Sequence, residues 1–324
     1  MNSVFDMLMM AGGGGHPVPP GPMISGTRES EWFQINFNVI EHDDTTHSVS
    51  LGNEYGLSWE WDNPSGWNIK KIVFNGIWGG GTTITLSGDW RSVTDMSSMF
   101  YGGALSAVTI NSIDTSNVTD MSSMFEGCRA TSITIGSIDT SNVTDMSRMF
   151  YQCNSLTTIT GIENINVSSV TDMSSMFEFC SSLTQNEDNS LDLSRWRPVS
   201  AVSLNRMFYT CQFLKEVYLF NNSGTYINVN NIDYIFASCT NLVSAEIGGI
   251  TCEECTEFVQ CFSGCDNLET LALTNMQTIQ VVSYSSNWDG FLGGVVGCSI
   301  RYKASLWNPD IVTAFSNNNW IDID

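Results

Sequence analysis

Positive charge is scarce in this sequence. Only 12 Lys and Arg residues oppose 34 Asp and Glu residues, which gives a net charge of −22 at pH 7. Nucleic-acid affinity rests mainly on Lys and Arg side chains that neutralise phosphates, and an acidic surface is likewise repelled by anionic membranes. We therefore expect no DNA or RNA partner.

Export and membrane signals are also lacking. The first fifteen residues contain no Lys or Arg, and Asp6 interrupts their apolar run, so a secretory signal peptide is not expected. The first cysteine is Cys128, which leaves no cysteine for a lipid anchor near the start. No apolar run approaches the roughly 20 residues that cross a bilayer, so membrane insertion is not expected either.

Catalytic constellations are missing too. His16, His42 and His47 fall in expected loops, and the sequence offers no Ser/His/Asp arrangement, phosphate-binding glycine loop or metal-ligand array. We therefore expect a protein that is not an enzyme and holds no cofactor or metal.

What the sequence does contain is a repeat. NVTDMSSMFEGC (117–128) recurs almost unchanged at 92–103, 142–153 and 169–180, with diverged copies at 201–211, 229–239 and 255–265. The anchoring phenylalanines lie 25 to 31 residues apart: Phe100, Phe125, Phe150, Phe177, Phe208, Phe236 and Phe262. Such a period indicates a solenoid in which each copy covers its neighbour.

Each copy predicts a strand, a turn and a short helix. Met121, Met124, Phe125 and Cys128 lie at i, i+3, i+4 and i+7, which is one face of a two-turn helix. The following residues 131–135 alternate Ile with Ser and Thr, as in a half-buried strand of a parallel sheet. The predicted repeat core comprises Met121, Met124, Phe125, Cys128, Met146, Met149, Phe150 and Cys153.

The run DTSNVTDMSSMFEGC (114–128), followed by its Ile-rich strand, resembles the BspA-like leucine-rich repeats of bacterial surface proteins. It is similar to their 25-residue variant, which also occurs in mycoplasma lipoproteins and predicted phage proteins. Leu191-Asp-Leu-Ser-Arg-Trp196 fits the strand-to-turn segment of that family. The resemblance covers roughly residues 82–307 and implies an α/β solenoid of leucine-rich-repeat type with an adhesion or recognition role.

Four segments are expected along the chain. Residues 82–297 form the solenoid, and 298–324 form a C-terminal cap with a closing strand near 299–306 and a helix near 310–315. Residues 28–81 lack the repeat and hold five of the ten tryptophans, which predicts a small β-rich capping domain. Residues 1–27 form an arm with a Gly- and Pro-rich spacer. Its apolar residues predict a docking segment, or alternatively a floppy tail: Val4, Phe5, Leu8 and Met9.

Two surfaces are candidates for recognition. Solvent-facing strand positions should form a flat polar face that a partner can approach closely, and they are Thr109, Asn111, Ser132 and Thr134. Trp59 and Trp61 either fill the core of the β-rich segment or contact a glycan or protein.

The cysteines and aspartates repeat with the same period. Six repeat cysteines should be buried free thiols, because neighbouring helices pack farther apart than a disulfide tolerates. Cys252 and Cys255 form a lone CxxC, for which zinc or redox chemistry is the lesser alternative. A column of Asp95, Asp120, Asp145 and Asp172 should cap the helices, with calcium bridging as the alternative.

These features predict a non-enzymatic virion surface protein of the fibre or receptor-binding type. Its arm would bind virion structural proteins, its solenoid would bind a host surface glycan or protein, and it would assemble with itself, with a trimer as the guess. The alternative is a bacterial cell-surface adhesin. A glycan-degrading enzyme is a third class, and it would need two acids in a cleft.

Overall fold

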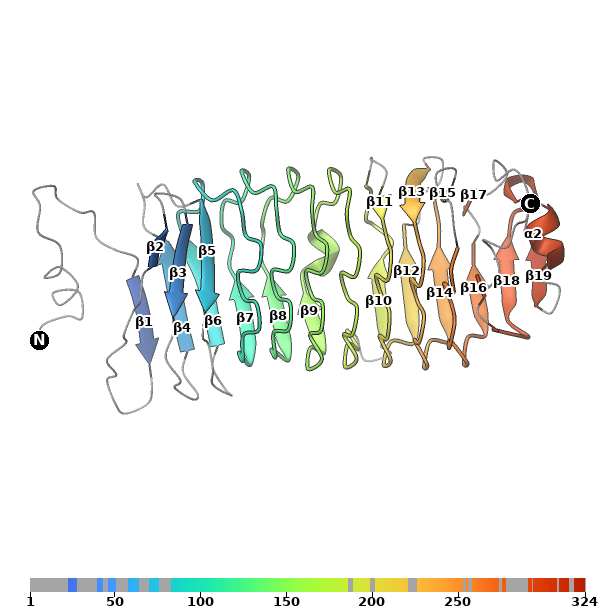
Figure 1. The fold of residues 1–324 in the computed structure, drawn as a ribbon, viewed down its shortest axis with the longest axis horizontal. Helices are drawn as coiled ribbons and strands as arrows, with labels where there is room; N and C mark the ends of the chain where they lie inside the picture. Colours follow the sequence, from blue (N-terminus) through green and yellow to red (C-terminus); the bar gives the residue numbers. More distant parts are fainter. Residues whose placement is uncertain are drawn as a thin grey trace, which may run out of the picture.

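The computed structural model is an elongated parallel β-solenoid of about seven turns (Figure 1). It describes residues 23–27, 40–42, 46–50, 58–63, 70–75, 83–185, 189–198, 202–220, 226–252, 255, 258–273, 276–277, 291–292, 294–307, 309–314 and 318–323. Four sheets are formed within these residues. The predicted parallel sheet is thus confirmed.

The first sheet runs in the order β1-β4-β6-β7-β8-β9. Its parallel strands come from successive turns of the solenoid, and only β1 is antiparallel to its neighbour. The strands are β1 (Met23–Thr27), β4 (Ser58–Asn63), β6 (Thr83–Gly88), β7 (Ala107–Ile110), β8 (Ser132–Ile135) and β9 (Thr158–Thr160). In β6, β7 and β8 every second residue is buried, as the Ile alternation predicts.

A second sheet continues the solenoid toward the C-terminal end (Figure 1). All its strands are parallel: β10 (Ser190–Leu193), β12 (Glu216–Leu219), β14 (Ser244–Ile247), β16 (Thr270–Ala272), β18 (Ser299–Tyr302) and β19 (Asn319–Asp322). The expected closing strand is β18, and the expected terminal helix is α2 (Pro309–Ala314). The edge strand β19 was not foreseen.

Two smaller sheets lie along the solenoid. One contains β11 (Val202–Ser203), β13 (Ile227–Asn231), β15 (Ile250–Thr251) and β17 (Met276–Gln277). The other contains β2 (Ile40–His42), β3 (Thr46–Ser50) and β5 (Lys71–Asn75). Within the described residues, the other helical elements are the single 3-10 turns η2 (Ile162–Asn164) and η4 (Ala304–Leu306).

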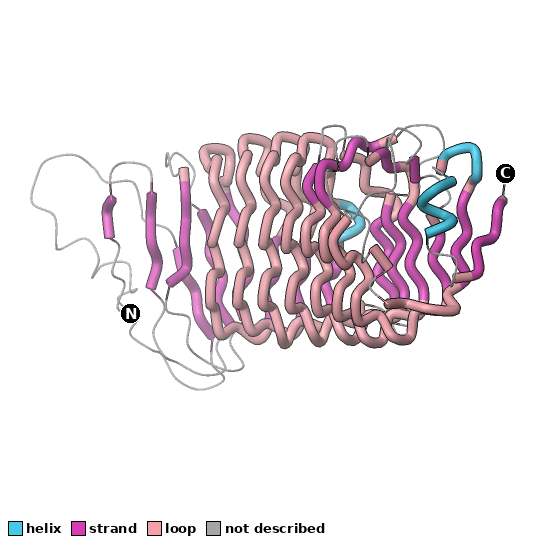
Figure 2. Tube along the Cα trace, turned by 45° about the vertical axis from the view of Figure 1, so that its right-hand side comes forward, coloured by secondary structure: helices cyan, strands magenta, loops and turns pink. Residues whose placement is uncertain are grey.

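The prediction of a short helix in each repeat is wrong. Residues 121–127 form turns, as do the equivalent residues of the other described copies (Figure 2). Alternate amides donate to the next solenoid turn: Ser123 N–H to Ser147 O at 2.9 Å and Phe125 N–H to Met149 O at 2.8 Å. Ser123 and Gly127 also have φ of 54° and 68°, which an α-helix excludes.

The same turns still bury every residue of the predicted repeat core. Met121, Met124, Phe125 and Cys128 are at most 1% exposed. In these consecutive turns, the side chains that point into the core have about the same sequence spacing as those on one face of a helix. The i, i+3, i+4 pattern therefore identified the core correctly and its secondary structure wrongly.

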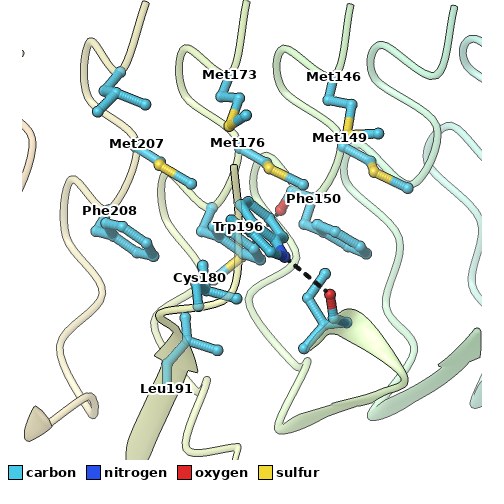
Figure 3. Packing of buried hydrophobic residues seen from close by; sticks show 14 of the residues in the cluster. Met146, Met149, Phe150, Met173, Met176, Cys180, Leu191, Trp196, Met207 and Phe208 are labelled. Carbon is cyan, nitrogen blue, oxygen red and sulfur yellow. Dashed lines mark hydrogen bonds between the residues drawn. The ribbon is translucent and has the colours of Figure 1, made fainter. Parts of the chain in front are cut away.

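Stacked phenylalanines form the centre of the core. Neighbouring ring centroids lie 5.2 to 5.4 Å apart, with interplanar angles of 18° or less, from Phe74 through Phe100 to Phe262. The methionines Met149, Met176 and Met207 repeat beside them (Figure 3). Trp196 enters the same core and donates its indole N–H to Ile162 O at 3.2 Å (Figure 3).

The structure does not confirm a separate β-rich domain over residues 28–81. Strand β4 pairs in parallel with β6, and Lys71 forms a parallel bridge with Asp95 of the first recognisable repeat. Phe74 begins the phenylalanine stack, 5.2 Å from Phe100. The described strands on both sides of the expected boundary therefore belong to the same solenoid.

Candidate functional site

The outward positions of the first sheet carry two columns of short side chains. In one column Thr85, Thr109, Thr134 and Thr160 are paired in register from strand to strand. In the other, the register joins Thr83, Ala107, Ser132 and Thr158. Parallel strands lie about 4.8 Å apart, so the hydroxyl groups form a regular grid that is interrupted at Ala107.

The predicted recognition residues lie on or beside this grid. Thr109 and Thr134 are direct register partners, and Ser132 lies in the adjacent column; all three are half-buried. Asn111 is exposed just beyond β7, where its backbone N–H donates to Leu86 O at 3.2 Å. The second sheet differs, because Tyr218 and Glu246 are paired at outward positions there. The hydroxyl grid thus belongs to the first sheet.

The other predicted sites lie partly outside the described residues. The arm residues Val4, Phe5, Leu8 and Met9 fall there. The backbones of Trp59 and Trp61 lie in β4, in register with Ile84 and Leu86, and their side chains are outside the description.

The aspartate column closes backbone turns. Asp95, Asp120, Asp145 and Asp172 form consecutive parallel bridges. Each Oδ1 accepts the N–H of the residue two positions later, at 2.7 to 2.8 Å. This is the capping hydrogen bond expected from the sequence, although it closes a turn and not a helix. Lys71 Nζ lies 2.9 Å from Asp95 Oδ2 at one end of the column.

The repeat cysteines form a second ladder inside the core. In Cys153, Cys180, Cys211, Cys239 and Cys265 the Sγ donates to the carbonyl oxygen of the preceding copy's phenylalanine. Cys153 reaches Phe125 O at 3.0 Å, and Cys180 reaches Phe150 O at 3.0 Å. Burial raises the pKa of the Cys128 and Cys265 thiols to about 12. All ten cysteines are free, and Cys255 of the CxxC pair is half-buried beside the fully buried Cys252. Among the described residues, no group of three or more His, Cys, Asp and Glu is placed to hold a metal ion.

An aromatic ridge on the turn side was missed from the sequence. Tyr151, Phe179, Tyr209 and Tyr234 come from four successive copies and contact one another edge to face, with centroids 5.9, 5.5 and 6.4 Å apart. All four side chains are half-buried. The sequence carries a signal for it, because these four aromatics lie within two residues of the repeat phenylalanines.

Two arginines complete the aromatic ridge. The Arg148 guanidinium lies 4.1 Å from the Tyr151 ring centroid, and Arg206 lies 5.1 and 4.8 Å from those of Tyr209 and Tyr234. Each arginine also pairs with a carboxylate of the preceding copy. Arg148 Nη2 lies 3.0 Å from Glu126 Oε1, and Arg206 Nη1 lies 3.5 Å from Glu178 Oε1.

Comparison with known proteins gives one family. The model of the family described as "Mycoplasma protein of unknown function, DUF285" matches residues 73–190, 132–245 and 204–290. No curated protein matches the chain. No helix within the described residues is both long and apolar enough to cross a membrane.

Proposed function

The chain belongs to the DUF285 family, and from that membership and the geometry of its surfaces we propose that it is a non-enzymatic recognition protein. The hydroxyl grid of the first sheet is the surface that contacts a host glycan or protein. The DUF285 family is associated with BspA-like surface repeat proteins, which supports a role at an outer surface.

The registered columns of Thr and Ser carry this proposal. Short hydroxyl side chains lose little rotamer freedom on binding, and each offers one donor and two acceptor lone pairs. The stacked phenylalanine core behind them holds neighbouring strands in fixed register. A partner with repeating polar groups therefore meets a preorganised surface.

A glycan-degrading enzyme is less well supported. Such an enzyme needs two carboxyl groups aimed at one glycosidic bond. The aspartate column engages its Oδ1 atoms with backbone amides, and Glu126 and Glu178 are paired with arginines. These acids have structural partners that account for their positions.

Substitution on the grid tests the proposal. Thr134→Arg places a bulky side chain at an outward position of β8, and we expect purified protein to lose adsorption to host cells while its Tm stays unchanged. Thr144→Arg is the matched control, because Thr144 is exposed and lies outside the strands, directly before Asp145. Normal adsorption by the Thr134→Arg variant would place recognition elsewhere.

The proposed setting is a virion surface, with residues 1–27 as the attachment arm. Deleting residues 1–15 should leave the solenoid folded but absent from purified particles, as mass spectrometry of the particles would show. Full incorporation of the truncated chain contradicts an arm that docks.

A bacterial cell surface is the second candidate, and the family description favours it because it names Mycoplasma proteins. Protease shaving of intact cells separates the two settings, since a surface adhesin is digested there and a virion protein is recovered from particles. Light scattering on the purified chain tests whether it forms the suggested trimer.

A further inference from the structure

The aromatic ridge is defined by Tyr151, Phe179, Tyr209 and Tyr234 with Arg148 and Arg206. All six residues lie in the turn segments of their copies, which Figure 2 shows as loops stacked side by side along the solenoid. The side chains of Arg148 and Arg206 are 47% and 41% exposed, so the aromatic ridge combines accessible guanidinium groups with partly accessible rings.

Two aromatic residues of the ridge have a positive φ, which is unfavourable for bulky side chains. Phe179 has φ of 62° at the position where three other copies carry Gly102, Gly127 and Gly264. Tyr234 has φ of 57° where other copies carry Ser98, Ser123 and Ser175. A bulky residue in the left-handed region is strained, and neither side chain is fully buried in return. Other copies of the repeat fold with glycine or serine at these positions. The requirements of folding alone therefore do not explain the aromatic residues.

The arginines are held in place before any partner arrives. Glu126 and Glu178 are only 11% and 6% exposed, and each fixes one edge of a guanidinium. The rings of Tyr151, Tyr209 and Tyr234 support the guanidinium faces. Ordering a long side chain contributes about 0.5–1.5 kcal/mol to the cost of binding, and these contacts reduce that cost for both arginines.

The composition of the aromatic ridge matches the centre of a protein–protein interface. Tyr, Phe and Arg are enriched in such centres, and Tyr and Arg are also frequent among the few residues that carry most of the binding energy. Stacking on a sugar ring requires a free aromatic face, whereas guanidinium groups already cover faces of three of the four rings. These contacts favour a protein over a glycan.

Charge indicates what kind of protein fits. The two arginines are neutralised locally by Glu126 and Glu178, so the net charge of −22 dominates the field around the aromatic ridge. Such a field accelerates association with basic partners and repels acidic ones. We propose that the aromatic ridge is a second binding surface, separate from the hydroxyl grid, and that its occupant is a basic protein segment with apolar side chains between its Lys or Arg residues.

Affinity selection from a random linear peptide library against the full chain tests this proposal. The variants take the residue that another copy uses at the same position: Phe179→Gly, Tyr209→Ala and Tyr234→Ser. We expect enriched peptides that are basic and apolar, and a Kd weakened about tenfold or more by each variant, as for a hot-spot residue. Thr134→Arg on the hydroxyl grid should leave peptide affinity unchanged.

Three results would overturn the proposal. They are no enrichment, enriched peptides that bind the three variants as well as the unaltered chain, or enrichment of acidic peptides. A glycan array probed with the same proteins tests the alternative partner. Glycan binding that the three variants abolish would show that the partner is a sugar and not a protein. Because adsorption through the hydroxyl grid is measured with a different variant, either proposal can fail without the other.

Discussion

The side-chain amide of Gln185 takes the place of a β-strand beside Ile159. Its Oε1 accepts the backbone N–H of Ile159 at 2.9 Å, and its Nε2 donates to the Ile159 carbonyl at 2.9 Å. The pair lies where the first sheet ends at β9 and before the second begins at β10. This copy carries the longest spacing of the repeat, between Phe177 and Phe208. The carboxamide thus provides hydrogen-bond partners for the backbone N–H and C=O of Ile159, which the longer loop of this copy would otherwise leave without a neighbouring strand.

Replacing Gln185 with Ala should therefore destabilise the solenoid. Two hydrogen bonds are lost and two backbone groups of Ile159 lose their partners, which costs about 1–3 kcal/mol. Chemical denaturation measures the loss, and hydrogen exchange at the Ile159 amide should become faster. Gln152→Ala is the control, since Gln152 is exposed and its side chain makes only a 3.4 Å hydrogen bond to Tyr151 Oη, while its backbone hydrogen bonds do not depend on the side chain. Equal effects of the two changes would contradict the strand-mimic role.

The repeat core could be predicted from the sequence because its pattern is local. The spacing of Met121, Met124 and Phe125 identifies buried positions whether the backbone forms a helix or a series of turns. The backbone itself is decided by long-range hydrogen bonds, such as that from Met121 N–H to Asp145 O at 3.0 Å. A pattern within one copy contains no information about that partner.

The start of the solenoid and the aromatic ridge escaped prediction for related reasons. Phe74 stacks on Phe100, but the surrounding residues 71–75 lack the DMSSM letters of the repeat. The aromatic ridge joins residues at three different repeat positions: Tyr209 directly follows its phenylalanine, Phe179 lies two residues after it, and Tyr234 lies two residues before it. Only the stacking of consecutive turns shows that these three positions are neighbours.

The buried thiols should make stability fall at alkaline pH. The thiol pKa is raised to about 12 in the folded chain for Cys128 and Cys265, whereas an unfolded cysteine has a pKa of about 8.5. Above the unfolded pKa, the unfolded chain releases these protons and the folded chain keeps them. Stability contributed by the neutral thiols is therefore complete below about pH 8.5 and declines as the pH rises toward 12. Denaturation at stepped pH measures this decline.

Alkylation provides an independent measurement of the same thiols. We expect the six repeat cysteines to resist alkylation in the native chain and to react fully after denaturation without reductant. Cys255, which is half-buried, should react sooner and serves as an internal reference. Disulfides between neighbouring copies, or rapid native alkylation of Cys180, would contradict the buried-thiol ladder.

Two glycines with positive φ should respond very differently to alanine. At Gly161, with φ of 89°, an added Cβ would lie 2.1 Å from Ile135 O, so Gly161→Ala combines backbone strain with a clash and should cost about 3 kcal/mol or more. At Gly127, with φ of 68°, the nearest atom would be 3.7 Å away. Gly127→Ala should then cost about 1 kcal/mol or less, because the reduced freedom of the unfolded chain offsets part of the strain. Thermal denaturation of both variants measures the two losses of stability. Similar losses would show that the close approach to Ile135 O is not the reason for a glycine at position 161.

The aspartate column sets like charges on successive turns about 4.8 Å apart. Asp120→Asn keeps an oxygen that can accept the Ser122 N–H, now 2.8 Å from Asp120 Oδ1, and removes the charge between Asp95 and Asp145. We expect the variant to be more stable than the unaltered chain at low salt by up to about 1 kcal/mol, with the difference shrinking in NaCl because salt screens the repulsion. Asp192→Asn, which alters the same kind of turn outside the column, should change little.

Calcium distinguishes repulsion from metal bridging in this column. If the carboxylates only close turns, CaCl2 and MgCl2 of equal ionic strength should raise the Tm of the unaltered chain by the same small amount. If Ca²⁺ bridges neighbouring carboxylates, it should raise the Tm well beyond Mg²⁺, and Asp120→Asn should abolish that excess because an amide is a weaker ligand than a carboxylate. The hydrogen bonds from Ser122 and Ser147 already occupy one oxygen of Asp120 and of Asp145. We therefore expect the first result, and a calcium-specific rise would overturn it.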